Sequence, residues 1–147
     1  MSHLEQFQRY ADAFEVTYDD DDWSRIAPYF ADDAVYRVKG LPFMPVDARG
    51  RDAVLGALKA AIDRFDRRCA KRELALNKPP ALDGDTVTID WSATYRLEGA
   101  DDLVFEGIET ARYNAAGEIV ELVDKYGPEM AERAANWFTK NGPALVG

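Results

Sequence analysis

Apolar residues recur at helical spacing in the first part of the chain. Between residues 4 and 18 they fall at steps of three and four, the spacing of one helix face; they are Leu4, Phe7, Ala11, Phe14 and Tyr18. The acidic run Asp19 to Asp22 follows. Because carboxylates at a helix C-terminus oppose the helix dipole, the helix should end here. A short second helix is predicted from Trp23 to about Phe30, and a third from about Arg51 to Arg68.

The second half of the chain has a pattern typical of β-strands. From Thr86 to Leu97, apolar and polar residues alternate as in a strand with one buried face. The other predicted elements are strands at residues 34–38, 73–77, 103–114 and 118–126, a loop at 39–50, and a closing helix from Pro128 to about Lys140. Consecutive strands joined by short turns predict an antiparallel sheet. Helices that mostly precede the strands indicate an α+β fold.

Length and composition are those of a globular protein. The chain has 147 residues, of which 47% are hydrophobic and 12% aromatic, so residues 1–147 are expected to form a single domain. No apolar run approaches the roughly 20 residues of a membrane span. The N-terminus lacks a basic stretch followed by an apolar one, so no secretory signal is expected. The single cysteine, Cys69, favours a reducing compartment, and we expect a cytoplasmic location.

Charge and the scarcity of histidine exclude several classes of function. Eighteen basic and 27 acidic residues give a net charge of −9. Since an acidic chain repels phosphates, neither nucleic acid nor a membrane is an expected partner. The only histidine, His3, lies at the N-terminus, so no Ser-His-Asp or Cys-His arrangement is available. Neither a metal site nor a cofactor is predicted, because the chain lacks His/Cys clusters and phosphate-binding glycine-rich loops.

Two segments resemble a known superfamily. The stretch from Asp22 to Tyr36, which contains Phe30-Ala31-Asp32-Asp33-Ala34-Val35, resembles the opening of nuclear transport factor 2-like proteins, and their SnoaL-like subgroup is the nearest. Residues 105–113 and 117–122 are similar to the paired end strands of that superfamily. The resemblance covers about residues 4–127. It implies a cone-shaped fold, in which a strongly curved antiparallel sheet wraps around N-terminal helices and leaves an apolar pocket. It also implies a homodimer formed through the outer face of the sheet.

Strand alternation selects two carboxyl groups that would face such a pocket. Glu109 points inward from the strand at 103–114 among small and apolar residues, and Asp124 points inward from the next strand. A carboxyl group in an apolar pocket has a raised pKa, which makes it a general acid or base near neutral pH. In the ketosteroid isomerase branch, an acid at the place of Glu109 donates a hydrogen bond to the developing oxyanion. A structural pairing is the alternative for Glu109, and it is the favoured role for Asp124, which lies near a strand end.

The resemblance to the isomerase branch is incomplete at two positions. Its helix tyrosine aligns with Phe14 and its general-base aspartate with Val38, so steroid isomerisation is not expected. Tyr18 or Tyr95 would then supply an orienting hydroxyl. The residues expected to line the pocket are Phe14, Tyr18, Trp23, Tyr36, Val38, Trp91, Tyr95, Phe105, Leu122 and Tyr126. For Trp23 a place in the hydrophobic core is favoured over one in the pocket, whereas Trp91 is expected in the pocket wall.

Two functions remain open at this point. The first is a pocket protein that binds a small apolar molecule and acts as a cofactor-free isomerase, cyclase, dehydratase or hydrolase through Glu109 and Asp124. The second is a non-catalytic, dimeric ligand-sensing or assembly module of the same fold. An open cavity that contains an acid favours the first, whereas a cavity filled by the protein's own aromatic rings favours the second.

Overall fold

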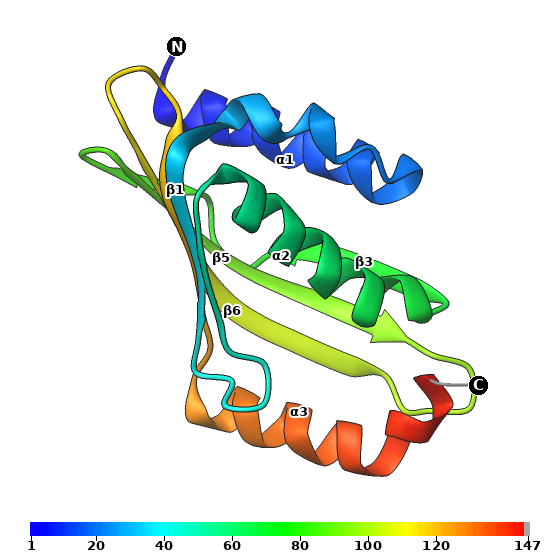
Figure 1. The fold of residues 1–147 in the computed structure, drawn as a ribbon. Coiled ribbons are helices and arrows are strands. Elements are labelled where there is room, and N and C mark those ends of the chain that lie inside the picture. The colour runs from blue at the N-terminus through cyan, green and yellow to red at the C-terminus, as the bar shows by residue number, and fades with distance from the viewer. Residues whose placement is uncertain (146–147) are drawn as a thin grey trace.

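A curled sheet wraps around two helices in the computed structural model, which describes residues 1–145 (Figure 1). The helices are α1 (His3–Asp20), α2 (Arg51–Arg64) and α3 (Pro128–Asn141). The strands are β1 (Phe30–Lys39), β2 (Val46–Arg49), β3 (Lys71–Leu76), β4 (Ala81–Asp83), β5 (Thr86–Arg96), β6 (Leu103–Tyr113) and β7 (Ile119–Lys125). Helices α1 and α2 lie on the inner side of the sheet, and α3 crosses its far end (Figure 1). The predicted α+β cone is confirmed.

The sheet is mixed, so the prediction of a wholly antiparallel sheet is wrong. Its strand order is β2-β1-β7-β6-β5-β3, and β4 pairs with β5. The meander of β5, β6 and β7 is antiparallel, as its short turns predict. Strand β1, however, pairs with β7 in parallel. These two strands are separated by most of the chain, and a parallel pair requires such a long connection.

The segment between α1 and β1 differs from the predicted short helix. It forms two 3-10 turns, Trp23–Arg25 and Ala27–Tyr29, and β1 already begins at Phe30. Pro28 lies in the first turn of the second, where its ring removes a backbone donor and prevents a continuous α-helix. The acidic run ends α1 as predicted: Asp21 adopts a left-handed conformation with φ 61°, and the Asp22 side chain accepts a hydrogen bond from the Ser24 amide.

Short edge strands and one helix end also depart from the predicted boundaries. Strand β2 lies in the predicted loop, and β4 was not predicted because three exposed residues carry no alternation. Helix α2 ends at Arg64, and a separate 3-10 turn, Asp66–Arg68, follows where a continuous helix was predicted. That break turns Asp66 inward, where it is only 8% exposed.

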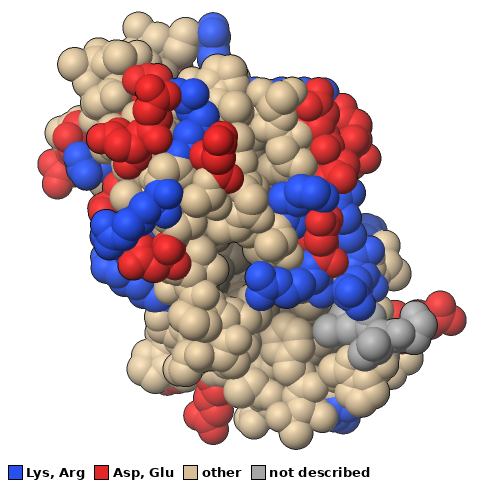
Figure 2. Space-filling model, in the orientation of Figure 1, with Lys and Arg blue, Asp and Glu red and all other residues tan. Residues whose placement is uncertain are grey.

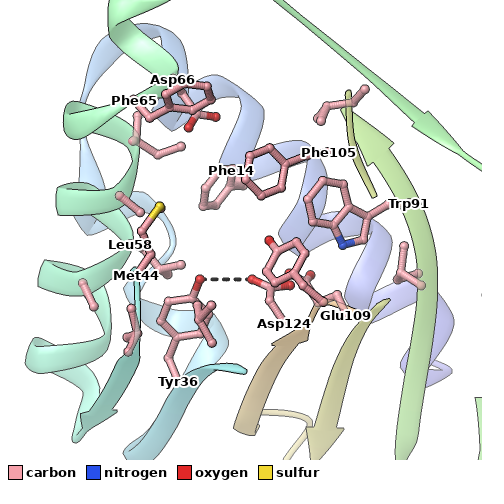
Figure 3. Close-up of a pocket in the computed structure, with 18 of the residues that line it drawn as sticks. Phe14, Tyr36, Met44, Leu58, Phe65, Asp66, Trp91, Phe105, Glu109 and Asp124 are labelled. Carbon is pink, nitrogen blue, oxygen red and sulfur yellow. Dashed lines mark hydrogen bonds between the residues drawn. The ribbon is translucent and has the colours of Figure 1, made fainter. Parts of the chain in front are cut away.

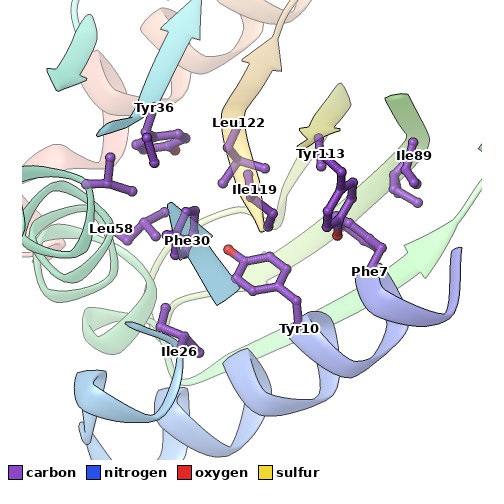
Figure 4. Packing of buried hydrophobic residues seen from close by; sticks show 14 of the residues in the cluster. Phe7, Tyr10, Ile26, Phe30, Tyr36, Leu58, Ile89, Tyr113, Ile119 and Leu122 are labelled. Carbon is purple, nitrogen blue, oxygen red and sulfur yellow. The ribbon is translucent and has the colours of Figure 1, made fainter. Parts of the chain in front are cut away.

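The core consists of two clusters of buried side chains. One lies between α1, α2 and the sheet and includes Phe30, Ile26 and Leu122 (Figure 4). The other joins α3 to the far ends of β5 and β6. Val38 and Trp91 pack against both clusters. Their side chains therefore lie where the two clusters meet. Within residues 1–145, no helix is long and apolar enough to cross a membrane.

Candidate functional site

A cavity of about 690 Å³ lies between helices α1 and α2 and the inner face of the sheet. Its volume is within the range of small-molecule sites. Figure 2 shows a hollow near the centre of this face of the molecule, bordered largely by uncharged side chains. Most of the residues that line the cavity are apolar or aromatic, and the carboxyl groups among them therefore sit in a poorly solvating environment.

Most of the predicted pocket residues lie on the wall of this cavity (Figure 3). Those that line it are Phe14, Tyr36, Val38, Trp91, Tyr95, Phe105, Glu109, Asp124 and Tyr126. The rings of Trp91 and Phe105 both pack edge-on against Tyr126, with centroids 6.0 and 5.5 Å apart. These aromatic rings form a continuous apolar wall next to the two acids.

Three predicted pocket residues lie elsewhere. Leu122 is 1% exposed and belongs to the core beneath α1. Trp23 is also a core residue, and its indole N–H donates to Asp21 at 2.7 Å. Tyr18 packs under the guanidinium of Arg72, 4.0 Å from the ring centroid. Sequence periodicity identifies the inward face of an element, but α1 and α2 fill part of the cone, so an inward side chain need not reach the cavity.

Glu109 and Asp124 are brought together by the pairing of β6 with β7. They are direct cross-strand partners, so their side chains leave the same face of the sheet side by side. Tyr36, from β1, donates a hydrogen bond from its hydroxyl to Oδ2 of Asp124 at 3.0 Å (Figure 3). Strands β1, β6 and β7 therefore fix the positions of Tyr36, Glu109 and Asp124. Of the Asp124 residue only 8% is exposed.

The pKa values of the two carboxyl groups are both raised, for partly different reasons. Burial, and then the adjacent charge of Asp124, raise the pKa of Glu109 well above its usual value. Burial also raises the pKa of Asp124, but hydrogen bonds from Glu109 and Tyr36 oppose that rise. Oδ1 of Asp124 is buried, and no N–H or neutral hydroxyl of the described residues reaches it. Because each charge opposes the ionisation of the other group, the two carboxyl groups titrate as a pair, and their raised pKa values favour a state in which the pair holds one proton.

A buried neutral donor lies in the same wall. The indole N–H of Trp91 has no acceptor among residues 1–145. Figure 3 shows the nitrogen on the side of the ring nearer Glu109. This N–H is therefore a buried, unpaired donor within the wall next to the two acids.

The opposite end of the cavity has a second polar group that the sequence did not predict. Asp66 lines the cavity and accepts a hydrogen bond from the Tyr95 hydroxyl at 3.1 Å. Arg72 lies 3.6 Å from the same carboxylate oxygen. Burial raises the pKa of Asp66 to about 6, although Arg72 and Tyr95 oppose this change. The sequence signal is weak, because Asp66 falls at the polar end of an apparent helix.

No arrangement for a metal ion is present in the part of the chain that the structure describes. Residues 1–145 contain no group of three or more His, Cys, Asp or Glu side chains placed to hold one ion.

Comparison with known families identifies one match. The family model described as the SnoaL-like domain matches residues 7–122, most of the chain. A search of curated proteins found no match.

Solved structures share the fold at low sequence identity. An NTF2-like protein of unknown function from Burkholderia pseudomallei is 14% identical with a TM-score of 0.70, and the match covers 95% of this chain and 99% of that one. A Mycobacterium tuberculosis protein in complex with estradiol-17β-hemisuccinate is 16% identical with a TM-score of 0.60, covering 84% and 95%. A hypothetical protein with a ketosteroid isomerase-like fold from Catenulispora acidiphila, in complex with trimethylamine, is 20% identical with a TM-score of 0.59, covering 83% and 88%. At these identities the likeness concerns the fold.

Proposed function

This chain belongs to the family of SnoaL-like domains, and from that premise we propose that it binds a small, largely apolar molecule and transfers a proton at the Glu109–Asp124 pair. The observation that carries the proposal is the pair itself, two adjacent carboxyl groups that line an apolar cavity and whose pKa values are both raised. An acid and a base are thereby held at the same place on the ligand, which is the requirement for general acid–base catalysis.

The reaction class is a proton transfer without a cofactor. Asp124 would accept a proton from the ligand, and Glu109 would donate one to an oxygen of the ligand. Isomerisation, cyclisation, dehydration and hydrolysis all include such a step. Phe14 and Val38 line the cavity at the positions that the resemblance aligns with the tyrosine and the general base of the isomerase branch, so Asp124 would serve as the base instead.

The ligand would have an apolar body of moderate size. The cavity volume of about 690 Å³ is sufficient for a fused-ring molecule. The Mycobacterium tuberculosis protein of the same fold binds estradiol-17β-hemisuccinate, which supports a ligand of this size class. An open cavity with an acid in it favours a ligand-binding protein over an assembly module that fills its own pocket.

Deuterium exchange tests the proton transfer directly. Ketones with apolar bodies are incubated with the protein in D₂O, and deuterium incorporation next to the carbonyl group is followed by mass spectrometry. We expect incorporation with the wild type and its loss with Glu109→Gln. Glu106→Gln is the matched control, because Glu106 is an exposed residue of the same strand that faces Arg133. Incorporation by Glu109→Gln at the wild-type rate would contradict the proposal, and ligand binding without exchange would indicate a ligand sensor.

A further inference from the structure

We propose that Asp66, Tyr95 and Arg72 form a second ligand subsite, which selects an elongated molecule with a hydroxyl or amine at the end remote from Glu109 and Asp124. The inference deepens the proposed function and rests on it only in that the same cavity holds the ligand.

The two polar groups lie at opposite ends of one apolar cavity. Figure 3 shows Asp66 at one end and the pair Glu109 and Asp124 at the other, with the rings of Phe14 and Phe105 between them. A ligand that contacts both ends must therefore present polar atoms at its two ends and an apolar surface between them.

The register of the sheet limits the length of such a ligand. Ile89 of β5 lies directly opposite Glu109, and Tyr95, six residues further along the same strand, binds Asp66. At about 3.3 Å per residue, six residues correspond to roughly 20 Å along the strand. The side chains converge across the concave face, so this length is an upper limit. A fused-ring system or an extended chain fits between the two ends.

The Asp66 carboxylate is held rigidly. Its Oδ2 accepts a hydrogen bond from Tyr95 at 3.1 Å and faces Nε of Arg72 at 3.6 Å. Arg72 is itself fixed, because it donates to Glu15 at 2.7 Å and stacks over Tyr18. The Arg72 side chain is 7% exposed. Contacts from α1, β3 and β5 thus hold one carboxylate at the cavity wall, and a fixed group binds a ligand with little loss of entropy.

The atoms of this subsite that can bind a ligand are hydrogen-bond acceptors, namely the oxygens of Tyr95 and Asp66. The Tyr95 hydroxyl gives its single hydrogen to Asp66, so that its oxygen keeps only lone pairs toward the cavity. Among residues 1–145, the side chains that contact the Asp66 carboxylate are those of Tyr95 and Arg72, both at Oδ2, and a backbone hydrogen bond from the Asp66 amide also lowers its pKa. A ligand that buries these acceptors without a donor would lose the hydrogen bonds that water provides. The subsite therefore favours a ligand hydroxyl or amine and disfavours a ketone.

Two steroid probes that differ at one end compare a hydroxyl with a ketone at this subsite. Testosterone and androstenedione share a rigid apolar ring system with a ketone at one end, and at the other end they carry a hydroxyl and a second ketone, respectively. We expect the wild type to bind testosterone about tenfold more tightly or better, since the ketone loses about 1.4 kcal/mol or more when acceptors remain unpaired. Isothermal titration calorimetry measures both affinities.

Variants then assign the preference to the subsite. Asp66→Asn presents an amide that donates as well as accepts, so the ratio of the two affinities should fall to about 1. Glu109→Gln, at the other end, should leave the ratio unchanged. Tyr95→Phe, which keeps the ring and removes one acceptor, should lower the ratio and serves if Asp66→Asn does not fold. A purely structural role for Asp66 would change both affinities equally.

Three outcomes would overturn the inference. They are equal affinities in the wild type, a ratio that Asp66→Asn and Tyr95→Phe leave unchanged, and a failure of both probes to bind. In the last case the ligand class named here is wrong, while deuterium exchange with Glu109→Gln still judges the proposed function separately.

Discussion

Glu109 and Asp124 lie directly opposite each other on β6 and β7, and the hydroxyl of Tyr36 holds the Asp124 carboxylate at 3.0 Å. Two ionised carboxylates at these adjacent positions in an apolar cavity would each raise the free-energy cost of charging the other. One shared proton removes that repulsion. Burial raises the pKa of Asp124, and the hydrogen bond from the Tyr36 hydroxyl opposes that rise, so it favours the ionised form of Asp124.

Removal of the Tyr36 hydroxyl should therefore weaken the pair. We expect Tyr36→Phe to lower the free energy of unfolding by about 1–3 kcal/mol, because Oδ2 of Asp124 loses its donor. Urea unfolding measures the change. Tyr29→Phe is the control, because no hydrogen bond joins the Tyr29 hydroxyl to another described residue, and it should alter stability by no more than about 0.5 kcal/mol. Equal effects of the two substitutions would contradict the role of Tyr36.

The protonated state of Glu109 has a spectroscopic signature. Burial and the charge of Asp124 raise the pKa of Glu109 well above its usual value, so its carboxyl group should carry a proton at pH 7. Infrared difference spectra between the wild type and Glu109→Gln should show the carbonyl stretch of a protonated carboxylic acid, which the variant lacks. The spectrum of Glu106→Gln should retain it. A wild type without this band at pH 7 would mean that both carboxyl groups are ionised.

Asp66 makes stability depend on pH in a direction opposite to that of a salt-bridged aspartate. Because burial raises the pKa of Asp66 from 3.8 to about 6, the folded state binds a proton more tightly than the unfolded one. Its contribution is therefore full below pH 3.8 and is lost as the pH rises through about 6. At 1.36 kcal/mol per pKa unit, the difference between the unfolded and folded pKa values of Asp66 corresponds to about 3 kcal/mol of stability.

The test compares the wild type with Asp66→Asn. Between pH 4 and pH 7, the stability of the wild type relative to the variant should fall by up to about 3 kcal/mol. Thermal or urea unfolding across this range measures the difference. Tyr95→Phe removes a hydrogen bond that lowers the pKa of Asp66, so its transition should move to higher pH. A difference between wild type and Asp66→Asn that is constant with pH would show that Asp66 has its ordinary pKa.

The inward face of each long strand could be predicted from the sequence, but the strand neighbours could not all be. Alternation along β5 and β6 places Trp91 and Glu109 on the inner face, and the short turn after β6 brings Asp124 beside Glu109. The parallel pairing of β1 with β7 has no such turn to indicate it. Alternation fixes which side of a sheet a residue faces and leaves the identity of a distant neighbour open.

The second polar group shows where the sequence pattern is insufficient. Residues 51–68 continue a helical spacing, which would leave Asp66 on a polar face in solvent. The structure instead ends α2 at Arg64, and Phe65 turns into the cluster beneath α3. Tertiary packing of that aromatic ring overrides local propensity and turns Asp66 into the cavity. Arg72 and Tyr95 then meet it from strands that are distant in sequence.

Gly107 gives the Tyr126 ring its place on the cavity wall. A Cβ at residue 107 would lie 2.8 Å from Cε1 of Tyr126 and 3.1 Å from the carbonyl oxygen of Lys125. We expect Gly107→Ala to displace this ring, to reduce stability by about 1–3 kcal/mol, and to weaken ligand binding. Gly56→Ala is the control, because nothing lies within 4 Å of its Cβ position and alanine favours its helix.

A double-mutant cycle separates the ring contact from the backbone contact. If Tyr126 is the neighbour that must move, the penalty of Gly107→Ala should shrink in a Tyr126→Ala background, with a coupling of about 0.5–3 kcal/mol. Urea unfolding of the four proteins gives this number. An unchanged penalty would mean that the backbone of Lys125, rather than the tyrosine ring, sets the requirement for glycine.

The outer face of the sheet is the surface through which we predict a homodimer. Helices α1 and α2 lie on the opposite side (Figure 1), and Thr88 and Thr110 face outward as direct cross-strand partners on β5 and β6. Carboxylates at both positions would place like charges from two copies against each other. We expect a dimer at micromolar concentration by light scattering, and a folded monomer for the combined variant Thr88→Glu with Thr110→Glu. Thr139→Glu, on α3, should leave the dimer intact. A monomeric wild type at that concentration would refute the prediction, and a dimeric double variant would place the interface elsewhere.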